Sequence, residues 1–241
     1  MAVYADLKDK RVLVTGAAGG IGQAQVKAFL KQGAKVIGVD RRESQLTDAL
    51  LTSVKLDLSD HDALVAFMQQ CEVDIVCNTA GVLDDFKPIG ETSEADFADI
   101  LQTNLNAVFT ITKHLIQQNR PLVFVNMSSY AGLSASGGGI SYTTSKHAIN
   151  GLTKEIAWEY GRQGVRANAI APCLVRTEMA KVDFETGLNV KLAAETVFNR
   201  YAEPAEIADL TLFLASDSSK YMTGQIISID GGYALGKNVT L

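Results

Sequence analysis

Short apolar segments alternate with helical stretches along most of the chain. The segments are continuously apolar, which is typical of parallel strands that helices cover on both faces. Seven of them stand out, at 11–15, 34–40, 53–57, 73–78, 122–127, 165–170 and 225–229. This alternation predicts an α/β fold with a doubly wound parallel sheet of about seven strands, in a three-layer αβα sandwich.

Composition limits the classes of protein to which the chain can belong. Its 241 residues include four prolines and no Pro/Gly/Ser-rich linker, so residues 1–241 are predicted to form one domain. The apolar fraction of 47% excludes a disordered chain. A net charge of −5 lacks the basic surplus of a nucleic-acid binder, and no apolar run approaches the roughly 18 residues of a membrane span. We expect neither nucleic acid nor a membrane as a partner.

The cysteines and histidines indicate the compartment and argue against a metal site. Cys71, Cys77 and Cys173 are odd in number and form no C-x-x-C pair, which disfavours a secreted disulfide framework. Residues 1–11 contain no apolar signal-peptide segment. The three histidines are scattered, without metal-ligand spacing. These features predict a cytoplasmic protein with no metal.

A glycine-rich turn, TGAAGGIG over residues 15–22, joins the first predicted strand to a helix over 20–32. Such glycines let the backbone approach a pyrophosphate, whose charge then lies at the helix N-terminus. Asp40 closes the second strand, where a carboxylate accepts hydrogen bonds from adenosine ribose hydroxyls. The glycines alone are also compatible with a turn that binds nothing. Together with Asp40 they favour a dinucleotide site.

The same acid bears on the choice between NAD and NADP. The carboxylate of Asp40 would repel a ribose 2′-phosphate, which favours NAD over NADP. Arg41 and Arg42 follow directly, and a guanidinium can recruit that phosphate. NADP therefore stays open as the alternative.

Tyr142 and Lys146 lie four residues apart at the start of a helical stretch that reaches about residue 161, so both face one side of the helix. A neighbouring ammonium favours the phenolate and lowers the pKa of a phenol, which suits it to general acid–base catalysis. By itself the pair also fits a solvated helix surface. Ser129 follows the strand at 122–127, at the sheet edge where ligands bind, and a serine there can hydrogen-bond a substrate oxygen.

In combination these motifs resemble the short-chain dehydrogenase/reductase family, of the subgroup called classical. The resemblance runs from about residue 7 to residue 233. It is carried by the TGAAGGIG turn, Asp57-Leu58, Asn78-Thr79-Ala80-Gly81, Asn104, Ser129, Tyr142-x-x-x-Lys146, residues 172–177 and residues 230–232. The overall similarity is to bacterial 3-oxoacyl-acyl-carrier-protein reductases and related sugar or polyol dehydrogenases.

The resemblance implies a catalytic role for each of four residues. Tyr142 is the general acid–base, and Lys146 lowers its pKa and binds the nicotinamide ribose. Ser129 orients the substrate oxygen, with Ser128 as a weaker candidate. Asn104 holds a proton-relay water. The implied cofactor-binding residues are Gly16, Ala18, Gly20, Ile21, Gly22, Asp40, Arg41, Asp57, Leu58, Asn78, Ala80, Gly81, Tyr142, Lys146, Pro172, Val175 and Thr177.

Two positions depart from the family pattern. Thr79 replaces the second asparagine of the N-N-A-G motif, and Cys173 replaces the glycine of a Pro-Gly pair near the nicotinamide. We expect the first to alter packing more than chemistry. We expect the second to be a tolerated small side chain, with a redox-sensitive thiol as the alternative.

The resemblance implies an NAD(P)-dependent enzyme that transfers a hydride between nicotinamide and a carbonyl or secondary alcohol. The favoured activity is that of a 3-oxoacyl-acyl-carrier-protein reductase, in fatty acid biosynthesis, and the alternative is a sugar, polyol or small diketone dehydrogenase. A catalytically idle dinucleotide-binding sensor is the non-enzyme alternative. The substrate is then a small molecule or an acyl thioester, bound under a lid at about 178–200. The resemblance also implies that four copies of the chain form a homotetramer.

An acyl-carrier protein is acidic, so its reductase needs a basic patch beside the pocket. The sequence offers Arg120, Arg162 and Arg166 for such a patch. They are equally compatible with solvated charges.

Overall fold

A computed structural model describes residues 2–135 and 138–236; residues 1, 136–137 and 237–241 of the predicted domain lie outside the described residues. Its strands form one parallel sheet with the order β3-β2-β1-β4-β5-β6-β7. The strands are β1 (Arg11–Thr15), β2 (Lys35–Asp40), β3 (Leu51–Lys55), β4 (Ile75–Asn78), β5 (Val123–Met127), β6 (Arg166–Pro172) and β7 (Ile226–Ile229). Each neighbouring pair is parallel. The predicted doubly wound, Rossmann-like α/β fold is confirmed.

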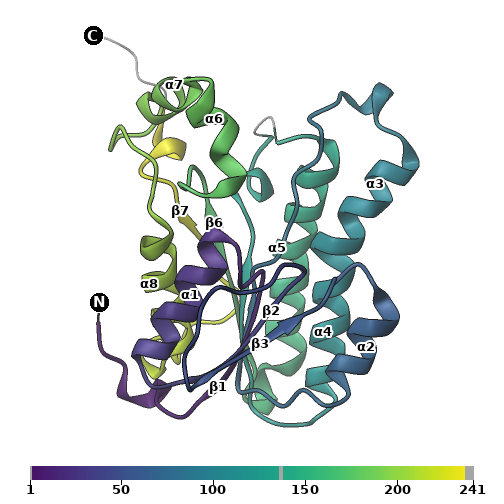
Figure 1. Ribbon diagram of the computed structural model, residues 1–241, viewed down its shortest axis with the longest axis vertical. Coiled ribbons are helices and arrows are strands. Elements are labelled where there is room, and N and C mark those ends of the chain that lie inside the picture. The colour runs from purple at the N-terminus through teal and green to yellow at the C-terminus, as the bar shows by residue number, and fades with distance from the viewer. Residues whose placement is uncertain (1, 136–137, 237–241) are drawn as a thin grey trace.

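Helices cover both faces of this sheet (Figure 1). On one face lie α1 (Gly20–Lys31) and α8 (Pro204–Ala215), and on the other lie α2 (His61–Met68), α4 (Ala107–Ile116) and α5 (Ile140–Tyr160). A π-helical turn, Gln102–Asn106, joins α3 (Glu94–Leu101) to α4. Two short helices, α6 (Lys181–Glu185) and α7 (Leu188–Ala194), lie beyond the strand ends, at the top of Figure 1. In the described part of the chain, no helix has both the length and the apolar character needed to cross a membrane.

The core explains why the strand segments are continuously apolar. Successive side chains of a strand point to opposite faces of the sheet. Val12 and Val14 of β1 accordingly pack with α1 and α8, whereas Leu13 packs into the cluster under α2, α4 and α5. The edge strand β3 is more exposed and includes Thr52 and Ser53. Its weak apolar pattern placed the predicted strand at 53–57, two residues too late.

The topology also positions a crevice. The chain crosses from β1 outward to β2 and β3, and then returns to β4 on the other side of β1. In such sheets, ligands bind at this switch point, outside the carboxyl ends of the strands. Thr15, Asn78, Met127 and Pro172 end the four central strands at that edge.

Candidate active site

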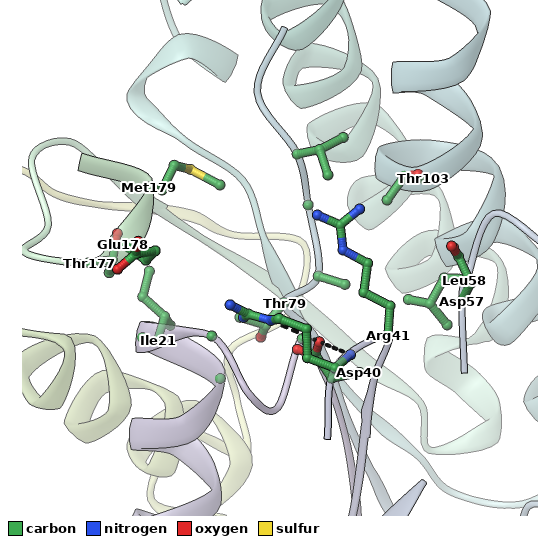
Figure 2. Close-up of a pocket in the computed structure, with 18 of the residues that line it drawn as sticks. Ile21, Asp40, Arg41, Asp57, Leu58, Thr79, Thr103, Thr177, Glu178 and Met179 are labelled. Carbon is green, nitrogen blue, oxygen red and sulfur yellow. Dashed lines mark hydrogen bonds and ion pairs between the residues drawn. The ribbon is translucent and has the colours of Figure 1, made fainter. Parts of the chain in front are cut away.

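A cavity of about 530 Å³ opens at the switch point, and Figure 2 shows the side chains that surround it. Eleven of the predicted cofactor-binding residues line it: Gly16, Gly20, Ile21, Gly22, Asp40, Arg41, Asp57, Leu58, Ala80, Gly81 and Thr177. The other six do not line this cavity: Ala18, Asn78, Tyr142, Lys146, Pro172 and Val175. The structure thus gathers most of the predicted set from five separate segments of the chain.

Ten further residues line the cavity that were not among the predicted cofactor-binding residues, although Gly19 and Thr79 lie within the quoted motifs and Arg42 was named as a possible partner of a 2′-phosphate. They are Gly19, Arg42, Leu56, Ser59, Thr79, Val82, Leu83, Thr103, Glu178 and Met179. Most are chain neighbours of predicted residues, so a wider window around each motif would have found them. Thr103, in the π-helical turn before α4, is likewise a chain neighbour of a predicted residue, Asn104.

The glycine turn is built for close backbone approach. A Cβ on Gly22 would overlap the carbonyl oxygen of Gly16, so the first turn of α1 lies directly against the start of the loop. The N-cap residue, Gly19, provides no side-chain cap for α1. The first N–H groups of α1 are therefore free to face an anion at the cavity.

Asp40 fastens the glycine turn to the end of β2. Its Oδ2 accepts a hydrogen bond from the backbone N–H of Ala18 at 3.0 Å, and its Oδ1 accepts one from the N–H of Arg42 at 2.9 Å. The Arg42 Nε also lies 3.4 Å from Oδ1, in an ion pair. Arg41 instead extends into the cavity, with its guanidinium on the side of Thr103 (Figure 2).

On the same side of the cavity as Arg41, the carboxylate of Asp57 is held by two hydrogen bonds (Figure 2). Its Oδ1 accepts from the backbone N–H of Ser59 at 2.9 Å and from the Ser59 hydroxyl at 2.7 Å. Both bonds lower the pKa of Asp57, and the backbone bond has the larger effect. The carboxylate therefore stays ionised.

The departure at Thr79 has a structural partner. Its hydroxyl donates to Gln25 Oε1 at 2.7 Å, and Gln25 Nε2 donates to the Thr211 hydroxyl at 2.9 Å. Gln25 and Thr211 are fully buried, on α1 and α8. The threonine therefore links the cavity loop to both helices of one face.

Three of the predicted catalytic side chains meet beside the cavity. Tyr142 and Lys146 come from the first turns of α5, and the Lys146 Nζ lies 5.4 Å from the centroid of the Tyr142 ring. Lys146 is buried and donates to the carbonyl oxygen of Met127, at the end of β5, at 2.8 Å. Ser129 follows β5 and hydrogen-bonds the phenol.

Burial dominates the titration of this pair. Burial raises the pKa of Tyr142, while the hydrogen bond from Ser129 lowers it to a smaller extent. Burial also lowers the pKa of Lys146 to about 8. From the sequence we expected the ammonium to lower the pKa of the phenol. Desolvation outweighs such an effect here, because Lys146 is buried and Tyr142 is half-buried beside it. The phenol is consequently neutral and ready to give a proton.

Asn104 has three hydrogen bonds to other parts of the protein. It is buried in the π-helical turn, and its amide binds both backbone groups of Val82: Oδ1 accepts from the N–H at 2.8 Å and Nδ2 donates to the carbonyl at 2.9 Å. Nδ2 also donates to the Ser145 hydroxyl at 3.1 Å. The side chain thus ties the cavity loop to α5, and holding a water stays a proposal for this residue.

Three neighbours of the site are structural. Ser128 is buried, with its hydroxyl 3.4 Å from the carbonyl oxygen of Lys146, which leaves Ser129 as the serine beside the phenol. Burial raises the pKa of Cys173 to about 12, so this thiol stays protonated. Val175 pairs with Ala202 in an isolated parallel bridge. In residues 2–135 and 138–236, no group of three or more His, Cys, Asp or Glu side chains is arranged to hold a metal ion.

A sequence model of the protein family described as enoyl-(acyl carrier protein) reductase matches residues 16–234. The chain belongs to the short-chain dehydrogenase/reductase family. The 3beta-hydroxysteroid dehydrogenase 2 of Eggerthella lenta is 31% identical, over 95% of this chain and 96% of that protein. A 3-oxoacyl-acyl-carrier-protein reductase of Thermotoga maritima is 32% identical, over 95% of this chain and 99% of its own. This similarity over nearly the whole chain shows that the protein is an oxidoreductase that acts on CH–OH groups.

Solved structures agree with this assignment. A 4-hydroxyisoleucine dehydrogenase complexed with NADH is 32% identical, with a TM-score of 0.88 over 95% of this chain and all of that one (100%). A Beutenbergia cavernae protein assigned as an NAD(P)-dependent gluconate 5-dehydrogenase, with NADP at low occupancy, is 27% identical, with a TM-score of 0.89 over 96% of this chain and 99% of that one. Members of this short-chain dehydrogenase/reductase group therefore bind either nucleotide.

The suggested basic patch for an acyl-carrier protein is wrong for this short-chain dehydrogenase/reductase. Arg120 lies just before β5, where it pairs with Asp74 at 2.8 Å and donates to the carbonyl oxygen of Val73. Arg166 begins β6 and donates to the carbonyl oxygens of Leu214, Ser216 and others. Arg162 follows the far end of α5. All three lie at the amino ends of the strands, opposite the cavity, because α5 runs antiparallel to the strands it covers.

Proposed function

We propose that this protein transfers a hydride between a nicotinamide nucleotide and a carbonyl or secondary alcohol, with Tyr142 as the general acid–base. The observation that carries the proposal is the cluster of the buried Lys146 with the half-buried Tyr142 and Ser129 beside a nucleotide-sized cavity. An idle sensor would not require a phenol, an ammonium and a hydroxyl to converge there.

The residues around the cavity fit a dinucleotide. The uncapped start of α1 suits a pyrophosphate, the Asp40 carboxylate suits ribose hydroxyls, and the ionised Asp57 suits an amine donor on a base. Thr177, in the segment after β6, lines the cavity near Ile21, on the side away from Asp57 (Figure 2). We infer that Ala18, Asn78, Pro172 and Val175 support these contacts from behind.

When bound, the nicotinamide supplies or accepts the hydride. For reduction, the neutral phenol of Tyr142 donates its proton to the carbonyl oxygen as that oxygen gains negative charge. The Ser129 hydroxyl hydrogen-bonds the same oxygen and the phenol, and so orients both. The Lys146 ammonium then stabilises the phenolate that remains. Asn104 holds Val82 and Ser145, which keeps the cavity loop and α5 in register.

We infer a preference for NAD over NADP from Asp40, because its carboxylate lines the cavity at the end of β2 and would repel a 2′-phosphate there. Its ion pair with Arg42 also occupies one of the two guanidinium groups that could bind that phosphate. We expect the protein to bind NADH at least ten-fold more tightly than NADPH in fluorescence titrations. Asp40→Ser should reduce this preference for NADH, because it removes the carboxylate that repels the 2′-phosphate and frees Arg42 from its ion pair. Comparable dissociation constants for the two nucleotides in the wild type would contradict the preference.

The pKa of Lys146 predicts the pH dependence of reduction. A lysine with a pKa of about 8 loses its ammonium as the pH rises through 8, and the support for the phenolate is lost with it. We expect kcat/KM for carbonyl reduction, which reports groups of the free enzyme, to fall as the pH rises above about 8. A profile that stays flat to pH 10 would contradict this assignment.

For the substrate, the lid segment favours a free small molecule over one carried by an acidic protein. Two of its cations face nearby acids: Lys181 pairs with Glu178 and Glu185, and Arg200 pairs with Glu206. Just before the segment, Arg176 pairs with Glu203. We propose residues 178–200 as the lid, and a small hydroxy or keto compound such as a sugar, polyol or diketone as the substrate. A 3-oxoacyl thioester is the second candidate, supported by the likeness to the Thermotoga reductase.

The experiment that tests the activity and separates these substrates is an assay panel. NADH and NADPH are each combined with keto sugars, small diketones and one short 3-oxoacyl group, the last presented both as a free thioester and on acyl-carrier protein. We expect turnover of a free small carbonyl compound. A strong preference for the carrier-bound thioester would favour the second candidate, and no turnover of any carbonyl compound would favour the idle sensor.

Assembly and location complete the proposal. We infer a homotetramer, because Phe109 of α4 and Trp158 of α5 expose 54% and 84% of their surface in the monomer. The family resemblance implies a second contact between subunits, formed by α8 and β7.

Cys71, Cys77 and Cys173 are free thiols, which fits a reducing, cytoplasmic compartment. We propose that residues 1–241 act as one nucleotide-binding unit.

A further inference from the structure

The catalytic helix α5 has no cap of its own. Its N-cap residue is Gly139, which has no side chain to bind the free N–H groups of the first turn. Asp84 replaces that cap from a distant loop. Its Oδ2 accepts hydrogen bonds from the backbone N–H groups of Ser141 at 3.0 Å and Tyr142 at 3.1 Å. These are the donors that an N-cap side chain normally binds, and a carboxylate also complements the positive end of the helix.

The carboxylate is fixed on its other side as well. Asp84 Oδ1 accepts from the N–H of Phe86 at 3.0 Å, in a turn where Phe86 has a positive φ of 58°. Gly139 has a φ of +82°, and a Cβ there would overlap the carboxylate of Asp84. A glycine at the start of α5 therefore allows Asp84 to approach the helix.

The same loop borders the cavity. Leu83, next to Asp84, lines it, and Val82 is bound through both backbone groups by Asn104. The loop is thus joined to α5 at two points. Asn104 connects Val82 to Ser145 of α5, and Asp84 binds the backbone of Tyr142 in the first turn of α5.

We propose that Asp84 is a positioning residue for Tyr142: it holds the first turn of the catalytic helix against the cavity loop, so that the phenol stays beside Ser129 and Lys146. The proposal rests on the proposed function of Tyr142. It predicts a loss of turnover without an equal loss of nucleotide binding, because the residues that line the cavity are unchanged.

Kinetics with the best carbonyl substrate of the panel test this role. We expect Asp84→Ala to lower kcat about 30-fold, with the dissociation constant for NADH within about three-fold of the wild type. Asp84→Asn keeps an acceptor oxygen and should recover most of the loss, to within about three- to ten-fold of the wild type, since bonds to a charged acceptor are stronger. The matched control is Asp85→Ala, in the same loop, where the exposed side chain pairs only with Lys87 in the described structure. It should change kcat less than two-fold.

Hydrogen exchange of the nucleotide-free protein provides a second measurement. The amides of Ser141 and Tyr142 should exchange at least ten-fold faster in Asp84→Ala than in the wild type, and at the wild-type rate in Asp85→Ala. If Asp84→Ala does not fold, both measurements are made on Asp84→Asn instead, with Asp85→Asn as its control.

Unchanged exchange at Ser141 and Tyr142, or a wild-type kcat in Asp84→Ala or in its replacement, would overturn the positioning role. So would equal losses of kcat in Asp84→Ala and Asp84→Asn. These results are distinct from a failure of the proposed function. If Tyr142→Phe retains turnover, the proposed mechanism is wrong whatever Asp84 does. If Tyr142→Phe is inactive while Asp84→Ala is fully active, only the role of Asp84 is wrong.

Discussion

Tyr142→Phe should lower kcat by about 10²- to 10⁴-fold, the range that general acid–base catalysis contributes. The variant loses only the hydroxyl that would give its proton to the substrate oxygen, and the ring keeps its packing. Tyr142 does not line the cavity, so NADH should bind with an affinity close to that of the wild type. Steady-state kinetics and a fluorescence titration with NADH measure the two quantities on the same sample.

The matched control is Tyr160→Phe, which removes a hydroxyl from the other end of the same helix. It should leave kcat within about two-fold of the wild type. Turnover above about one tenth of the wild-type rate in Tyr142→Phe would refute the assignment of the phenol as the acid–base.

Gly22→Ala should abolish tight nucleotide binding and destabilise the fold. The added methyl group would overlap the carbonyl oxygen of Gly16, a backbone atom, so either α1 or the glycine turn has to move. Forcing extra volume into a packed site costs about 1–3 kcal/mol of the free energy of unfolding. A displaced turn no longer presents its N–H groups to a pyrophosphate, and we expect NADH to bind at least ten-fold more weakly.

Urea unfolding followed by circular dichroism, together with a titration with NADH, measures both effects. Gly90→Ala is the control, because a Cβ at that exposed glycine meets no atom within 4 Å. Its free energy of unfolding should stay within about 0.5 kcal/mol of the wild type. Wild-type affinity and stability in Gly22→Ala would show that the turn is free to relax, and would remove the packing argument.

Most of the fold and a large part of the cavity lining were predictable from the sequence. The buried strands were recognisable because helices cover both of their faces, which leaves runs of apolar residues with no polar interruption. The edge strand β3 was misplaced for the opposite reason, since Thr52 and Ser53 are exposed and leave no such run. The glycine turn was recognisable because backbone overlap, as at Gly22, restricts the residue type in a way that the sequence displays directly.

Electrostatic conclusions from the sequence were less successful. An i,i+4 spacing correctly brings Lys146 near Tyr142, but it contains no information about burial. Burial decides the direction in which both pKa values move. In the same way, three arginines close in sequence to predicted strands were offered as a docking patch, although the direction of each element places them opposite the cavity.

The order and type of the elements, the glycine turn and the Tyr142–Lys146 pair follow from the sequence alone, because each depends on residues close together in the chain. Only the tertiary structure shows that Asp84 caps α5, that Asn104 holds Val82 and that Thr79 reaches Gln25. These contacts join segments 22 to 58 residues apart. Hydrogen bonds of this kind form where folding brings a donor and an acceptor within about 3 Å, and no local spacing or periodicity records that distance.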